Sequence, residues 1–142
     1  MPAKTVLVIG VFDLFHRGHV EFLRRARQFG DRLIVIVNGD EFVSKYKRKP
    51  IFSEDDRLAI VASLRDVDVA FISNSPDARP AIEEHGIDLI VHGDDWEHAS
   101  YLQQICVDQD YLDSRNIEMK YVPYYVGIST SEIIERTRDT RR

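Results

Sequence analysis

Two histidines three residues apart, His16 and His19, have the side chains and spacing to bind one anionic group together. They follow Val6–Ile9, an apolar run that is too short for a helix and is typical of a buried parallel strand. Apolar residues then recur at helical spacing from 20 to 29, and Gly30 supplies a stop. The pair is therefore predicted to lie where a strand ends and a helix begins, a place whose free N–H groups and dipole attract phosphates.

Two other interpretations of the histidine pair stay open from spacing alone. His16 and His19 are also the kind of polar residues found in turns. They could equally be part of a metal site, although they supply only two ligands and no cysteine lies near them.

A basic segment begins at Lys45 and places four cations within residues 45–49. Such a run is typical of a solvated loop. It follows the apolar run Leu33–Val37, however, and α/β sheets bind ligands at the carboxyl ends of their strands. In a chain of net charge −5, this segment is the local basic cluster that an anionic substrate needs, and a loop there could close over a triphosphate.

The elements that must position these residues form an alternating pattern. Strand, helix and strand within about 35 residues indicate a βαβ unit with parallel strands. Helices are predicted from Ser53, from Pro80 to Gly86, over 100–114 and from the capping-box pair Ser129 and Glu132. The predicted strands are Val6–Ile9, Leu33–Val37, Val69–Ile72, Ile87–Val91 and Ile117–Val122. This pattern predicts a three-layer α/β fold, and the motifs of a dinucleotide-binding Rossmann site and of a P-loop are absent.

Composition limits the class of protein. With 142 residues and 44% hydrophobic content, residues 1–142 are expected to form a single domain. No apolar run approaches the roughly 20 residues that span a bilayer and no signal peptide is recognised, so no membrane insertion is expected. The acidic net charge disfavours a nucleic-acid binder. The single cysteine, Cys106, is predicted to be a small filler on a helix in a reducing, cytoplasmic protein.

Four segments together resemble one enzyme family. Residues 10–19 are similar to the HxGH signature of the nucleotidyltransferase superfamily. Residues 65–68, 93–96 and 127–131 narrow the resemblance to cytidylyltransferases similar to the glycerol-3-phosphate enzymes, and the four segments fall in family order. The resemblance implies a Rossmann-like five-stranded parallel sheet of order 3-2-1-4-5. It also implies transfer of a cytidylyl group from CTP to a small phosphorylated alcohol with release of pyrophosphate, by a homodimer.

The resemblance also suggests roles for individual residues. His16 and His19 would serve the α/β phosphate bridge, and Arg65 and a loop cation such as Lys47 would hold the leaving pyrophosphate. Mg²⁺ is expected as the cofactor, with Asp13 as the candidate ligand. Residues expected to contact the nucleotide are Gly10, Val11, Phe12, Asp13, Gly18, Lys45, Arg48, Gly93, Asp94, Asp95, Trp96, Gly127, Ile128, Ser129 and Thr130.

The acceptor is where this sequence departs from the relatives it resembles. They tend to have a hydroxyl residue in place of Val11 and an arginine near Tyr124–Val126, and their segment equivalent to 100–116 is shorter. Glycerol 3-phosphate is the first expectation, with a phosphonate or an amino-alcohol phosphate as alternatives. Two further alternatives are an adenylyltransferase of the flavin-nucleotide type and a non-catalytic nucleotide-binding regulator.

Overall fold

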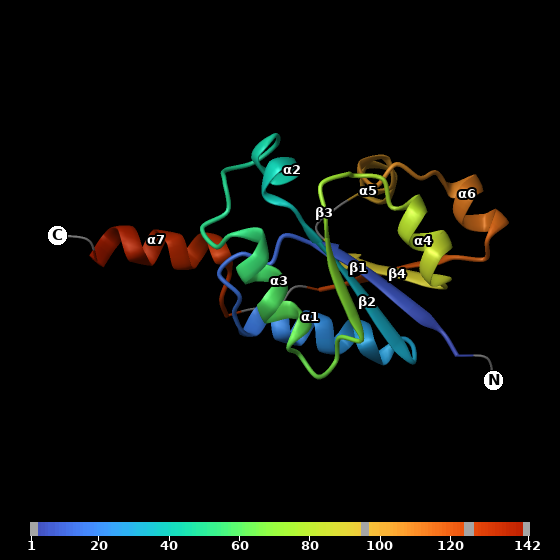
Figure 1. Ribbon diagram of the computed structural model, residues 1–142, viewed down its shortest axis with the longest axis horizontal. Coiled ribbons are helices and arrows are strands. Elements are labelled where there is room, and N and C mark those ends of the chain that lie inside the picture. Colours follow the sequence, from blue (N-terminus) through green and yellow to red (C-terminus); the bar gives the residue numbers. More distant parts are fainter. Residues whose placement is uncertain (1–2, 95–96, 124–126, 141–142) are drawn as a thin grey trace.

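The computed structural model describes residues 3–94, 97–123 and 127–140, which form one parallel sheet with helices on both faces (Figure 1). The strands are β1 (Thr5–Gly10), β2 (Arg32–Asn38), β3 (Val69–Ser73), β4 (Leu89–Gly93) and β5 (Glu118–Val122). The helices are α1 (Arg17–Gln28), α2 (Asp40–Ser44), α3 (Glu54–Ala62), α4 (Arg79–His85), α5 (His98–Gln104), α6 (Gln109–Ser114) and α7 (Thr130–Thr140). The strand order is β3-β2-β1-β4-β5, which confirms the predicted fold and order.

Alternate residues of the central strands face two separate hydrophobic cores, as the pleat of a strand requires. In β2, Ile34 and Ile36 pack with α4, α5 and α6, whereas Leu33, Val35 and Val37 pack with α1 and α3. Both faces of the sheet are thus covered, which explains the continuous apolar runs of the sequence. The covered faces leave the carboxyl edge of the strands to form a site.

The region from 98 to 114 differs from its prediction. It contains two short helices, α5 and α6, and not one long helix. The break contains Cys106, whose φ of 63° lies in the left-handed region, and Asp108 caps α6 by accepting from the N–H of Tyr111. Cys106 is exposed, so its predicted role as a filler within a helix was wrong. Buried Ile105 and Val107 flank it and pull the chain back onto the core.

Two features place functional segments at the carboxyl edge. The short helix α2 follows β2 directly and was not predicted; it leads into the basic segment. Helix α7 extends away from the sheet, as Figure 1 shows, and its first residues return to the turn after β1 through a hydrogen bond from Thr130 to the Asp13 carbonyl. None of the described helices is both long and apolar enough to cross a membrane.

Candidate active site

The turn between β1 and α1 holds the two histidines as a reciprocal cap. His16 is the N-cap of α1, and its Nδ1 accepts from the N–H of Gly18 at 2.9 Å. Nδ1 of His19 accepts in turn from the N–H of His16 at 3.1 Å. The two rings lie 4.0 Å apart between centroids. A Cβ at Gly18 would lie 2.6 Å from Cε1 of His16, so a glycine is needed for the ring to fold over the helix start.

This cap determines what the histidines can donate. Since each Nδ1 accepts a backbone N–H, the neutral ring carries its proton on Nε2. Burial lowers the pKa of His16, and burial together with the neighbouring His16 lowers the pKa of His19 to about 4. Both rings are therefore neutral Nε2–H donors at pH 7. This chemistry suits stabilisation of phosphate oxygens better than transfer of a proton.

Backbone strain accompanies this turn. Phe12 and Leu14 have φ values of 57° and 48°, in the left-handed region that non-glycine residues seldom adopt. They flank Asp13, whose side chain is buried. Each such residue costs on the order of 1 kcal/mol or more, and strain of this kind is common at functional sites.

The Asp13 carboxylate ties the turn to the basic segment. Oδ2 accepts from the N–H of Ile51 at 2.8 Å and lies 3.3 Å from Nη1 of Arg48. Oδ1 accepts from the N–H groups of Phe52 at 2.9 Å and Leu14 at 3.1 Å. These contacts hold residues 48–52 against the histidine turn. The anchor links segments 38 residues apart, and the resemblance did not suggest it.

The same contacts bear on the expected metal. Both oxygens of Asp13 already accept hydrogen bonds, and Arg48 places a positive charge at Oδ2. Among the described residues, no group of three or more His, Cys, Asp or Glu side chains is placed to hold a metal ion. Asp13 therefore anchors a loop in this structure, and its role as a Mg²⁺ ligand stays a prediction.

A second helix begins beside the histidine turn. Ser129 caps α7, with its Oγ accepting from the N–H of Glu132 at 3.1 Å as predicted, and Thr130 donates to the Asp13 carbonyl at 3.0 Å. The start of α1 and the carbonyl of Ile128 approach closely, since a Cβ on Gly18 would lie 3.4 Å from that oxygen. Two helix N-termini of adequate length therefore converge on one place, which favours a chain of several phosphates.

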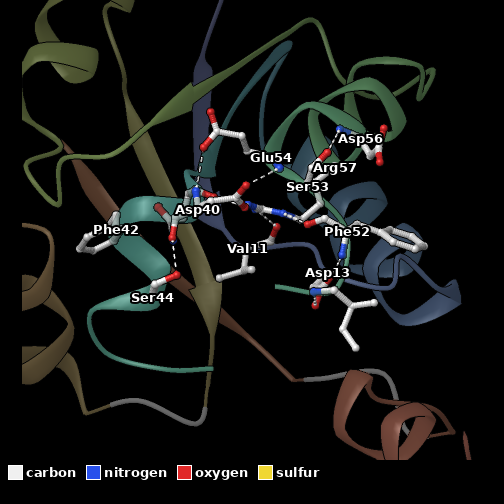
Figure 2. Close-up of polar contacts among 12 residues, drawn as sticks. Val11, Asp13, Asp40, Phe42, Ser44, Phe52, Ser53, Glu54, Asp56 and Arg57 are labelled. Carbon is white, nitrogen blue, oxygen red and sulfur yellow. Dashed lines mark hydrogen bonds and ion pairs between the residues drawn. The ribbon is translucent and has the colours of Figure 1, made fainter. Parts of the chain in front are cut away.

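Arg57 of α3, to which the sequence analysis assigns no role in the site, organises the back of this region (Figure 2). Its side chain is fully buried and donates to the carbonyls of Val11 at 2.8 Å, Asn38 at 2.6 Å and Phe52 at 3.1 Å. Nη2 also pairs with Asp40 at 2.6 Å. Although burial alone would raise it, hydrogen bonds from Arg57 and the Glu54 backbone lower the pKa of Asp40. The sequence does indicate the burial of Arg57, because its helical spacing to the apolar residues 61 and 64 places it on the same face of the helix.

These segments enclose a cavity of about 680 Å³ at the carboxyl edge, within the size range of small-molecule sites. It runs from the starts of α1 and α7 to an opposite end formed by α2, the turn after it and α5. The sequence-predicted residues that line it are Gly10, Val11, Phe12, Asp13, His16, Gly18, His19, Lys47, Arg48, Gly93, Ile128, Ser129 and Thr130. Sequence reasoning did not assign a role in the site to Asn38, Tyr46, His92, Tyr101 or Gln104, which also line it.

Other predicted residues lie elsewhere. Arg65 is exposed after α3 and precedes β3, whose first residue, Val69, pairs with Ile34 near the start of β2. This is the opposite edge of the sheet, so the structure removes Arg65 from the site of its own chain. Asp68 of the same motif is structural here, since it accepts from the N–H of Leu33.

Three further predicted residues, Lys45, Asp94 and Gly127, are not among the residues that line the cavity. Lys45 is exposed and pairs with Glu41 at 3.9 Å, and Asp94 is exposed with its N–H donating to the Val122 carbonyl. Gly127, with φ of 154°, precedes the lining residue Ile128. Asp95 and Trp96 lie outside the described residues, as do Tyr124–Val126.

Comparison with known proteins matches the sequence of this chain to one family. The family model described as cytidylyltransferase-like matches residues 7–136. Glycerol-3-phosphate cytidylyltransferase of Bacillus subtilis (strain 168) is 37% identical over 134 residues, which cover 93% of this chain and 95% of that protein. The FAD synthase of Aciduliprofundum boonei is 46% identical over 90 residues, which cover 63% of this chain and 60% of that protein.

A third relative is much longer than this chain. The bifunctional protein HldE of Alcanivorax borkumensis is 36% identical over 140 residues. These residues cover 96% of this chain but only 28% of that protein. The similarity therefore concerns one part of the bifunctional relative.

Proposed function

Since the chain belongs to the cytidylyltransferase-like family and is a nucleotidyltransferase, we propose that it transfers a cytidylyl group from CTP to a small phosphorylated alcohol, glycerol 3-phosphate first. The observation that carries the proposal is the pair of neutral Nε2–H donors at the start of α1, beside the start of α7. One relative that spans nearly the same length is a glycerol-3-phosphate cytidylyltransferase.

The proposed reaction is a direct displacement. An oxygen of the acceptor phosphate attacks the α-phosphorus of CTP and forms a P–O bond, while the bond to the β-phosphate oxygen breaks and pyrophosphate leaves. The acceptor oxygen is already anionic at neutral pH, so no side chain has to remove a proton. Catalysis then comes from positioning and from stabilisation of developing charge.

The residues of the site have distinct parts in this proposal. His16 and His19 donate from Nε2 to oxygens at the α/β bridge, where negative charge grows as the bond breaks. Lys47 and Arg48, with the start of α7 at Ser129, neutralise the leaving pyrophosphate. Mg²⁺ belongs to the proposal only as a companion of the triphosphate, since such ions are commonly held by phosphates and few protein ligands.

A second candidate reaction, adenylyl transfer, can be tested in the same way. The similarity to an FAD synthase favours adenylyl transfer from ATP to riboflavin 5′-phosphate, itself a phosphorylated alcohol. Phosphonates and amino-alcohol phosphates are further acceptors to compare. A non-catalytic nucleotide-binding role would give no pyrophosphate with any pair.

The experiment is a pyrophosphate-release screen that crosses CTP, ATP, GTP and UTP with these acceptors. We expect the highest kcat/KM with CTP and glycerol 3-phosphate. His16→Asn is the matched variant, because asparagine is a good N-cap but lacks the Nε2–H donor. It should keep the melting temperature and lower turnover by about a hundredfold, the typical effect of losing one preorganised donor. Near-normal turnover in this variant contradicts the proposed role of His16.

A homodimer and a cytoplasmic location complete the proposal. Sedimentation equilibrium of the purified chain tests the first, and cell fractionation tests the second. A monomer at the concentrations used for the activity screen would contradict the dimer without affecting the proposed chemistry.

A further inference from the structure

A second, smaller cavity lies beside the first. It measures about 240 Å³ and is lined by Phe42, Tyr46, Pro76 and Gln104. Tyr46 and Gln104 also line the larger cavity, so these two side chains form the wall between the two. We infer that this wall limits the size of the acceptor's organic group, and that the smaller cavity admits a flat apolar group when the wall is opened. The inference rests on the proposed function.

The position of the acceptor follows from where the phosphates lie. The histidine turn and the start of α7 are proposed to hold the phosphates, and they form one end of the larger cavity. The other end consists of α2, the turn after it and α5, through Val43, Tyr46, Tyr101, Gln104 and Ile105. These five side chains carry no charge at pH 7 and suit the neutral organic part of an acceptor, whereas Lys47 and Arg48 of the same turn line the cavity as cations for the phosphates.

The wall itself combines an aromatic ring and an amide. The Tyr46 ring packs on the Phe42 ring at 5.0 Å between centroids, and its hydroxyl has a hydrogen bond with the Asn38 side chain. Gln104 ends α5, beside buried Leu102 and Ile105. Hydroxyl groups of a short polyol can bond to these polar atoms, whereas a larger group would have to displace the ring.

The space behind the wall has different chemistry. Phe42 and Pro76 present an aromatic face and a rigid apolar ring there, which favour a flat apolar group. Tyr46 is 47% exposed, so the fold does not depend on burying its ring. Replacing Tyr46 with alanine should therefore join the two cavities without unfolding the chain.

The test compares two phosphorylated alcohols at saturating CTP: glycerol 3-phosphate and 2-phenylethyl phosphate, which carries a flat ring. Tyr46→Ala should raise the ratio of kcat/KM for the phenylethyl ester to that for glycerol 3-phosphate by about tenfold or more, within the range by which pockets discriminate added apolar groups. Tyr46→Phe removes the hydroxyl but keeps the ring, so it should raise the ratio far less than Tyr46→Ala does. Tyr111→Ala on α6, which lines neither cavity, is the control for loss of a tyrosine.

The outcomes separate this inference from the proposed function. If both esters react and Tyr46→Ala leaves their ratio unchanged, the inference is overturned and the proposed function stands. If neither ester reacts with the wild type, the proposed function fails for these acceptors. Dissociation constants from isothermal titration calorimetry then decide the inference, because Tyr46→Ala must still shift the relative affinity toward the phenylethyl ester. An unchanged relative affinity, or no binding to any variant, overturns it.

Discussion

Replacing Arg57 with methionine should destabilise the fold far more than the loss of a surface arginine. The substitution keeps the length of the side chain but removes every donor from a fully buried position. It leaves the carbonyls of Val11, Asn38 and Phe52 without the guanidinium, and it removes the partner of Asp40.

The magnitude follows from what stays behind. Removing one partner of a buried ion pair typically costs about 3–5 kcal/mol. The Asp40 side chain is 32% exposed and can regain water, which lowers its share of the cost. The three carbonyls add to it, since an unsatisfied buried acceptor costs roughly 1–3 kcal/mol. We therefore expect the free energy of unfolding to fall by about 3–5 kcal/mol, a large fraction of the total for a single domain.

Urea denaturation at pH 7, followed by circular dichroism, measures this change. Arg79→Ala is the control, because Arg79 forms a half-exposed pair with Asp77 at 2.8 Å and its loss should leave the free energy of unfolding nearly unchanged. Arg57→Lys should fall between the two, since an ammonium group cannot reproduce the fork of a guanidinium. A loss below about 1 kcal/mol for Arg57→Met, with an unchanged m-value, refutes the reasoning.

Three further predictions concern the site. Asp13→Asn should release residues 48–52, so trypsin should cleave after Lys47 and Arg48 about tenfold faster, which corresponds to a local opening easier by about 1.4 kcal/mol. Asp77→Asn is the control, and equal cleavage rates in Asp13→Asn and the wild type would contradict the anchor. Because His19 has a pKa of about 4 when folded and near 6.5 when unfolded, the unfolded state binds more protons between these values. The free energy of unfolding should therefore fall as pH drops through that window, by about 2 kcal/mol at pH 5. If the urea midpoint of His19→Asn depends on pH as that of the wild type does, His19 is not the cause. Neutralising Lys45, Lys47 and Arg48 together should weaken triphosphate binding and raise the KM for CTP by tenfold or more. If only the melting temperature changes, the segment has a purely structural role.

The sheet could be predicted from sequence because its strands are apolar runs with sharp ends. Residues 33–37, buried on both faces, lie within the observed β2, whereas the predicted strand 87–91 was placed two residues early relative to β4. The strand order came from the resemblance, since local patterns carry no information on which strands are neighbours. The break at Cys106 could not be predicted, because the buried neighbours on either side impose it.

The site was predictable where its contacts are local and not where they are distant. The cap at Ser129 was predicted from its spacing to Glu132, and the position of His16 at a helix start was predicted from the pattern around it, whereas the cap that His16 forms was not. The anchor from Asp13 to Ile51 and the bond from Arg57 to Val11 join distant segments, so periodicity gave no direct sign of either partner. Arg65 was assigned to the site by a motif match, and such a match carries no information about the edge of the sheet at which the residue lies.

The left-handed backbone at Phe12 and Leu14 restricts which substitutions an engineer can make beside the histidines. A β-branched residue at either position would add to the steric cost already present, so a random library there would consist largely of unstable variants. Glycine or asparagine would relieve the steric crowding. Glycine would also give the turn more backbone conformations, so that holding the histidines in place would cost more conformational entropy. Diversity aimed at new acceptors belongs at positions with ordinary backbone, such as Tyr46 and Gln104, where a changed side chain alters the wall and leaves the turn as it is.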